Sequence, residues 1–140
     1  MSTGVPSPSN LRSDSEIVCQ WARSQVYDHL LIENKNMPIP QIKVGVHGIS
    51  IGGLAASHLG RIGAVDFLFL DRTFRDLTSF PKGFHYSLPY FLTFITMWEN
   101  PSVSEDYLLS NCYKVIAQDP NDEVIGDGIS CKTGVSLKII

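Results

Sequence analysis

Residues 44–53 read Val44-Gly45-Val46-His47-Gly48-Ile49-Ser50-Ile51-Gly52-Gly53, and they are the most informative part of the chain. An apolar, strand-like segment leads into a Gly-x-Ser-x-Gly pattern, and small residues follow it. A sharp turn from strand to helix strains the serine backbone and is tolerated when the residues two positions away have almost no side chain. Gly48 and Gly52 meet this demand. The pattern therefore predicts that Ser50 projects its hydroxyl at the carboxyl end of a strand, beside a helix N-terminus that favours negative charge.

The same pattern is also compatible with a glycine-rich turn that has no chemical role. The order of the neighbouring segments favours the catalytic interpretation, because residues 41–46 precede the turn as a strand and a helix is expected over about 52–59. Two further strands are predicted at 65–70 and 113–117, and an acidic loop follows the last.

The N-terminal part is predicted to be a helix packed on an apolar surface. Ser13 and Glu16 have the spacing of a capping box and indicate a start between Ser9 and Ser13. Trp21 is expected in the core. The apolar residues at helical spacing are Leu11, Val18, Ala22, Val26 and Leu30, with Ile17 and Trp21 widening the stripe.

Helices and strands alternate, which predicts one α/β domain with a parallel sheet flanked by helices. The nearly continuous apolar run at 65–70 is typical of a parallel strand covered on both faces. The aromatic stretch at 74–98 has two interpretations, a lid or acyl-pocket wall and a helix pair that buries its hydrophobic side.

Composition excludes several classes. The 140 residues are 44% hydrophobic and 18% charged, with a net charge of -3 and no basic stripe, which argues against nucleic acid as a partner. Three widely spaced cysteines argue against a disulfide framework or a zinc site and indicate a cytoplasmic rather than a secreted protein. No apolar run reaches the length of a membrane span, and the polar N-terminus is no signal peptide. The sequence makes no prediction about contact with a membrane surface.

Four segments together resemble the α/β-hydrolase superfamily, in particular its serine-aminopeptidase, lysophospholipase and thioesterase-like branches. Residues 2–7 resemble the loop after the fourth strand, and 46–53 resemble the nucleophile elbow. Residues 69–74 are similar to the following strand end, with its Asp-x-x-Phe pattern. Residues 118–125 resemble the acid loop His-Gly-x-x-Asp-x-x-Val/Ile, but carry Gln-Asp in place of His-Gly.

The resemblance implies a serine hydrolase that acts on a small-molecule acyl ester, thioester or peptide, without a metal or organic cofactor. Ser50 would be the nucleophile, and the backbone N–H of Ile51 would form half of the oxyanion hole. Asp122 would orient a histidine base, with Asp71 as the alternative acid. The neighbouring carboxylates are expected to be solvated loop or capping groups, and they are Asp119, Glu123 and Asp127.

The family order is serine, acid and then histidine, but no histidine follows Asp122. The four histidines are His29, His47, His58 and His85. His47 is expected to be a strand-end packing residue. His29 and His58 are expected to be solvated or to form local hydrogen bonds. An alternative triad of Ser50, Asp71 and His85 has the right order.

The chain is therefore expected to be a partial α/β-hydrolase domain that lacks the first strands and the C-terminal histidine segment. Its parts are predicted as a loop at 1–9, helix-strand-elbow-helix at 10–61, a strand at 65–71, a helical, lid-like insertion at 74–110, and strand, acid loop and helix start at 113–140. The second oxyanion donor and the strand beside the elbow strand would both be missing, which predicts poor solubility and little or no activity.

Two functions follow as hypotheses: a serine hydrolase, or a non-catalytic fragment or pseudoenzyme of that family with no independent activity. A nucleotide-binding domain is disfavoured, because neither Gly-x-Gly-x-x-Gly nor Gly-Lys-Ser/Thr occurs at the first strand-helix turn.

Overall fold

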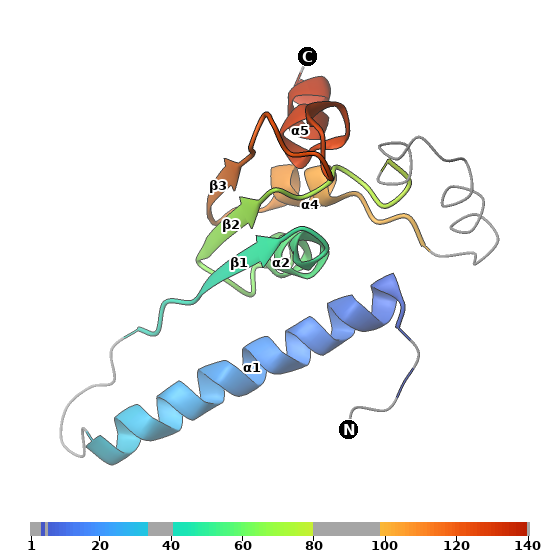
Figure 1. Cartoon of the computed structure of the whole chain (residues 1–140). Coiled ribbons are helices and arrows are strands. Elements are labelled where there is room, and N and C mark those ends of the chain that lie inside the picture. The colour runs from blue at the N-terminus through green and yellow to red at the C-terminus, as the bar shows by residue number, and fades with distance from the viewer. Residues whose placement is uncertain (1–3, 5, 34–40, 80–98, 140) are drawn as a thin grey trace.

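A computed structural model describes residues 4, 6–33, 41–79 and 99–139, and the elements, contacts and exposures are those of this part of the chain. Figure 1 shows a small parallel sheet with helices on one side and a long N-terminal helix beyond them. The helices are α1 (Pro8–Glu33), α2 (Gly52–Arg61), α4 (Val103–Leu109) and α5 (Cys131–Ile139), with a 3-10 turn, η2, at Asp127–Ile129. The strands are β1 (Gly45–Ile49), β2 (Phe67–Asp71) and β3 (Tyr113–Ala117). The predicted α/β class is confirmed.

The three strands run parallel in the order β1-β2-β3. Gly45 pairs with Phe67, and Phe67 with Tyr113, so all three strands end at the same edge of the sheet. The third strand has the predicted bounds. The first begins later than expected, because residues 41–44 are not in the sheet.

The core lies between one face of the sheet and the helices α2, α4 and α5. Leu68 and Leu70 of β2 are fully buried there against Leu54 of α2 and Val103 of α4. Alternation along a strand sends every second side chain to the opposite face.

On the opposite face of the sheet, the described residues leave several side chains exposed to solvent. Tyr113 is 85% exposed, and Ile49, Phe67 and Val115 are also exposed. The expectation of a second strand covered on both faces is therefore wrong for the described residues. The reason is that α1 contacts α2 and does not lie on the open side of the sheet (Figure 1).

The first helix starts earlier than predicted. Ser7 caps it, because its hydroxyl accepts a hydrogen bond from the Asn10 N–H at 3.1 Å, and Pro8 is favoured at the first helical position. The capping-box prediction for Ser13 is wrong. Glu16 lies inside the helix and binds His58 Nε2 at 2.6 Å.

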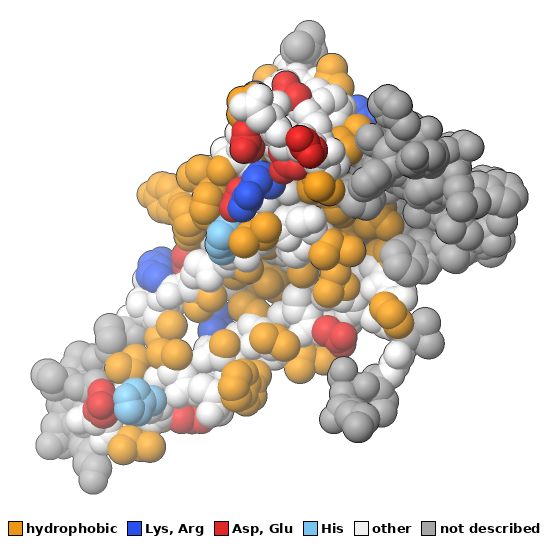
Figure 2. Space-filling model, viewed as in Figure 1, with side chains coloured by type: hydrophobic (Ala, Val, Ile, Leu, Met, Phe, Trp, Pro, Cys, Tyr) orange, Lys and Arg blue, Asp and Glu red, His pale blue; other side chains and the backbone are white. Residues whose placement is uncertain are grey.

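The predicted apolar stripe of α1 does not face the core. Trp21 is 62% exposed, and Ile17, Val18 and Val26 are exposed as well. Figure 2 shows hydrophobic side chains on the outer surface along this helix. The periodicity correctly identified a helix, but the prediction that its apolar stripe is buried, with Trp21 in the core, is wrong for the described residues.

The sheet and the helices packed on it hold α1 mainly through polar groups, and these lie on another face of α1 than the apolar stripe. Arg12 donates a hydrogen bond to Asp106 of α4 at 2.6 Å, and Arg23 donates to the Ala64 carbonyl oxygen at 2.7 Å. Asp106 is 1% exposed and also accepts from Arg61 of α2 at 2.7 Å. Cys19 adds an apolar contact between these polar groups. Three helices thus meet at one buried carboxylate.

Residues 80–98 lie outside the described part, so the predicted lid or helix pair and the alternative histidine His85 are not addressed by the structure.

Candidate functional site

Ser50 occupies the turn between β1 and α2 and has a φ of 51°. This left-handed conformation is unusual for a residue other than glycine and stores strain unless its surroundings hold it in place. The Ser50 N–H donates to the Asp71 carbonyl oxygen at 3.1 Å. The Ser50 carbonyl oxygen accepts from the Thr73 hydroxyl at 2.7 Å and from the Gly53 N–H at 3.1 Å. The turn is therefore fixed by the chain that follows β2.

Two glycines allow the helix to lie close to the strand. A Cβ at Gly48 would stand 2.6 Å from the Ala56 Cβ, and one at Gly53 would stand 2.1 Å from the Thr73 hydroxyl oxygen. A Cβ at Gly52 would meet nothing within 4 Å. The steric demand predicted for Gly48 is confirmed, whereas the demand predicted for Gly52 is wrong and falls on Gly53.

Two polar groups of the turn have no hydrogen-bond partner among the described residues. Ser50 is half-buried, and no described residue forms a hydrogen bond with its hydroxyl. Ile51 stands at the N-terminus of α2, and its backbone N–H has no acceptor among the described residues. The two groups adjoin one another along the chain, as a nucleophile and an oxyanion donor must.

Asp71 ends β2, one strand over, and lies in register with Ile49. Its carboxylate accepts hydrogen bonds from Arg72 Nε at 3.0 Å and Arg72 Nη2 at 3.2 Å. These bonds lower the pKa of Asp71 below its ordinary value, and the nearby His47 lowers the same pKa further. Arg72 itself has a φ of 45°, so strained residues follow both β1 and β2.

His47 lies beside Asp71, a pairing that the sequence did not predict. Its ring stacks on Phe69 with centroids 4.6 Å apart, and its Nε2 lies 3.6 Å from Asp71 Oδ2. The expected packing role is therefore only part of its environment, because the ring is 45% exposed and pairs with a carboxylate. In the parallel register His47 pairs with Phe69, and Asp71 lies two residues further along β2. Alternation therefore places the side chains of His47 and Asp71 on one face, but this pairing cannot be derived from either segment alone.

Asp122, the acid that the resemblance predicts, lies in the loop after β3. Its Oδ1 accepts from the N–H groups of Val124 at 2.8 Å and Ile125 at 2.9 Å. These bonds lower the pKa of Asp122, and the charge of Arg72 lowers it further. No described histidine contacts Asp122. Asp122 holds the loop after β3 in shape, and the charge of Arg72 acts on it as it does on Asp71.

The other described histidines are engaged elsewhere. His58 binds Glu16, and His29 lies 3.3 Å from Glu33 on the same helix. Asp119 accepts from the Asn121 N–H at 2.9 Å, in agreement with its predicted role in the loop. The described residues thus bring Ser50, the Ile51 N–H, Asp71, Arg72 and His47 to one edge of the sheet, and they hold Asp122 in the adjoining loop.

Within the described ranges, no group of three or more His, Cys, Asp or Glu side chains has an arrangement that could hold a metal ion. No helix in the described part of the chain is long and apolar enough to cross a membrane.

Comparisons with models of known protein families, with curated proteins and with solved structures found no match to this chain. The resemblance to the α/β-hydrolases therefore remains a hypothesis that depends on the short segments around Ser50, Asp71 and Asp122.

Proposed function

We propose that Ser50 is the nucleophile of a serine hydrolase that acts on an ester, thioester or peptide bond within a partial α/β-hydrolase fold. The observation that carries the proposal is the left-handed Ser50, at the junction of a parallel strand and a ten-residue helix, with an unpartnered hydroxyl among the described residues. A strained turn of this kind is costly, and strained backbone clusters at functional sites.

The chemistry would proceed in two acyl transfers. The Ser50 hydroxyl attacks the carbonyl carbon while a histidine accepts its proton, and the Ile51 N–H donates to the oxyanion of the tetrahedral intermediate. The leaving group departs with a proton, and water then hydrolyses the acyl-enzyme. No step requires a metal or an organic cofactor.

A second candidate is a non-catalytic fragment or pseudoenzyme with no independent activity. One observation favours it: no described histidine contacts Ser50 or Asp122, and His47 pairs with Asp71. A serine without a base is a weak nucleophile.

A fluorophosphonate probe separates the two candidates, because it reacts with activated serines. The first candidate predicts that the full chain is labelled in the folded state, as judged by circular dichroism, and that Ser50→Ala abolishes the labelling. Ser24→Ala is the matched control, since Ser24 is an exposed serine on α1 whose hydroxyl only binds the Trp21 carbonyl oxygen. A folded chain that the probe does not label supports the non-catalytic candidate.

The role of His47 can be tested in the same assay. If the pair of His47 and Asp71 supplies the base, His47→Gln should reduce labelling at least tenfold. If labelling is unchanged, the base lies elsewhere in the protein, and His85 is the next position to replace.

A further inference from the structure

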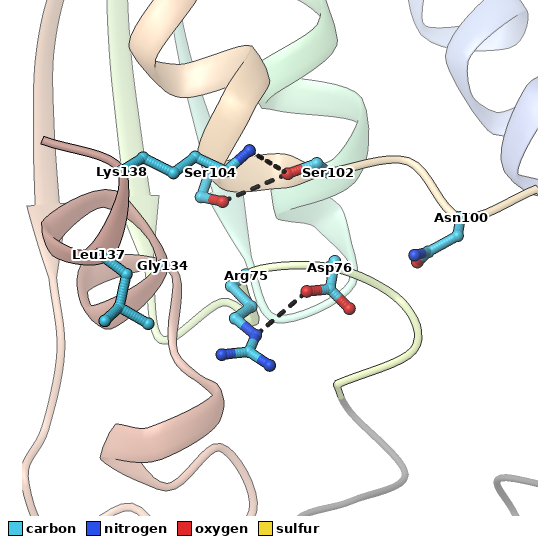
Figure 3. Close-up of a pocket in the computed structure, with 8 residues that line it drawn as sticks. All are labelled: Arg75, Asp76, Asn100, Ser102, Ser104, Gly134, Leu137 and Lys138. Carbon is cyan, nitrogen blue, oxygen red and sulfur yellow. Dashed lines mark hydrogen bonds and ion pairs between the residues drawn. The ribbon is translucent and has the colours of Figure 1, made fainter.

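A separate cavity of about 300 Å³ lies between the chain after β2, the segment that leads into α4, and α5 (Figure 3). None of its lining residues belongs to the candidate site around Ser50. Its volume falls at the lower end of the range of about 300–1,000 Å³ for small-molecule sites. The lining residues are Arg75, Asp76, Asn100, Ser102, Ser104, Gly134, Leu137 and Lys138.

The walls of the cavity are tied together. The Ser104 N–H donates to the Arg75 carbonyl oxygen at 3.1 Å, and Asp76 forms an antiparallel bridge with Ser102. A Cβ at Gly134 would stand 2.5 Å from the Arg75 Cβ and 3.0 Å from the Ser104 hydroxyl oxygen. The helix α5 therefore packs directly on both other walls, which fixes the backbone from which the cationic and hydroxyl side chains extend.

Arg75 has donors to spare. Its Nε donates to Asp76 Oδ2 at 3.1 Å, whereas its two terminal nitrogens form no hydrogen bond with a described residue (Figure 3). The other oxygen of Asp76 accepts from the Thr78 hydroxyl at 2.8 Å and the Ser79 N–H at 2.7 Å. These bonds hold the Asp76 carboxylate beside Nε, so that an anion would bind the guanidinium through its two terminal nitrogens.

Lys138 and two serines line the other side. Figure 3 shows Lys138, Ser104 and Ser102 in one row, opposite Arg75 and Asp76. The Lys138 ammonium lies 3.3 Å from the Ser102 hydroxyl, which is 3.2 Å from the Ser104 hydroxyl. Lys138 also binds the exposed Glu105 at 3.1 Å. Such a surface ion pair contributes little stability, so the ammonium can exchange it for a bound anion at small cost.

We propose that this cavity binds the phosphate group of a small phosphate monoester. Arg75 and Lys138 supply two cationic donors from different elements, and the hydroxyls of Ser102 and Ser104 supply neutral ones. A tetrahedral phosphate has oxygens for donors on several sides, and arginine and lysine are the usual residues that hold it. Leu137 gives an apolar surface to the organic part of the ligand. The proposal does not depend on the function of Ser50.

Titration calorimetry of the full chain with phenyl phosphate, at constant ionic strength, tests the proposal. We expect saturable binding, with phenol and benzoate at least tenfold weaker. Lys138→Gln and Arg75→Gln should each weaken phenyl phosphate binding at least tenfold, as the loss of a charge-assisted hydrogen bond implies. Lys132→Gln is the matched control, because Lys132 is exposed on the same helix and faces Asp127.

Four results would overturn the proposal: no saturable binding by the wild-type chain, benzoate binding as tight as phenyl phosphate binding, tight binding that survives Lys138→Gln, or equal affinity for inorganic phosphate. Lys138 is exposed, so its replacement leaves the fold intact and keeps the test valid even if Arg75→Gln unfolds the chain. Equal affinity for inorganic phosphate would show that the organic part contributes nothing, and the assignment to an ester would be wrong. Ser50→Ala should bind phenyl phosphate like the wild type.

Discussion

Gly48 and Gly52 flank Ser50 symmetrically in the sequence, but the structure predicts opposite effects when each is replaced by alanine. At Gly48, the added methyl group would stand 2.6 Å from the Ala56 Cβ and 2.7 Å from the Gly52 carbonyl oxygen. Ordinary contact begins near 3.4 Å, so β1 and α2 would have to separate by about 0.8 Å. At Gly52, the methyl group would meet no atom within 4 Å.

The magnitudes follow from these two environments. Overpacking of a close interface costs ~1–3 kcal/mol, so we expect Gly48→Ala to lower the free energy of unfolding by about 2 kcal/mol. Gly52→Ala should raise it by about 0.5 kcal/mol, because alanine restricts the unfolded chain and is compatible with a helical position. A domain of this size changes its Tm by roughly 4 °C per kcal/mol, which separates the two variants by about 10 °C.

Urea and thermal unfolding, followed by far-UV circular dichroism, measure the difference. The urea slope m should be the same for both variants, which shows that the unfolded surface is unchanged. Fluorophosphonate labelling of Ser50 should also fall more in Gly48→Ala than in Gly52→Ala, since only the former shifts the strand against the helix. Equal Tm values for the two variants, or a more stable Gly48→Ala, would refute the packing argument.

Three further predictions address charge and surface. Asp106→Asn should lower the free energy of unfolding in urea by about 3 kcal/mol, because it leaves Arg12 and Arg61 without their shared buried carboxylate; a change below about 1 kcal/mol would contradict this. The depressed pKa of Asp122 stabilises the fold above the ordinary pKa of about 4, and this stabilisation is lost as the pH falls through the lower folded value. Asp122→Asn should therefore flatten the stability profile below pH 4 in acid titrations, and an unchanged profile would argue against the loop contacts. Tyr113→Lys should reduce aggregation measured by light scattering, because it places a charge on the open sheet face; identical scattering would show that this face is not what associates.

The buried carboxylate of Asp106 explains how a helix with an exposed apolar surface stays attached. Its two arginine partners come from α1 and α2, and the pKa of Arg61 is raised by its contact with Asp106. Glu16 and His58 add a second polar contact between the same two helices. The exposed residues of α1, such as Trp21, therefore contribute little to its position on this body.

Local pattern was sufficient for the elements of the sheet and for the turn at Ser50. The run of small residues around Gly48 predicted a close strand-to-helix junction, and the apolar segment at 113–117 predicted its strand, because both signals depend only on neighbours along the chain. The strained backbone of Ser50 could also be predicted from its neighbours along the chain, because a tight turn imposes this strain locally.

Tertiary structure alone decided which groups meet. The burial of α1 through Arg12, Cys19 and Arg23, and the pairing of His47 with Asp71, depend on contacts between elements far apart in the chain. The apolar stripe of α1 marked a helix and selected one face as buried, but the described residues leave that face exposed and hold the helix through Arg12, Cys19 and Arg23 instead. Strand register is likewise absent from a single segment, and only the parallel sheet placed His47 beside the Asp71 carboxylate in addition to its packing on Phe69.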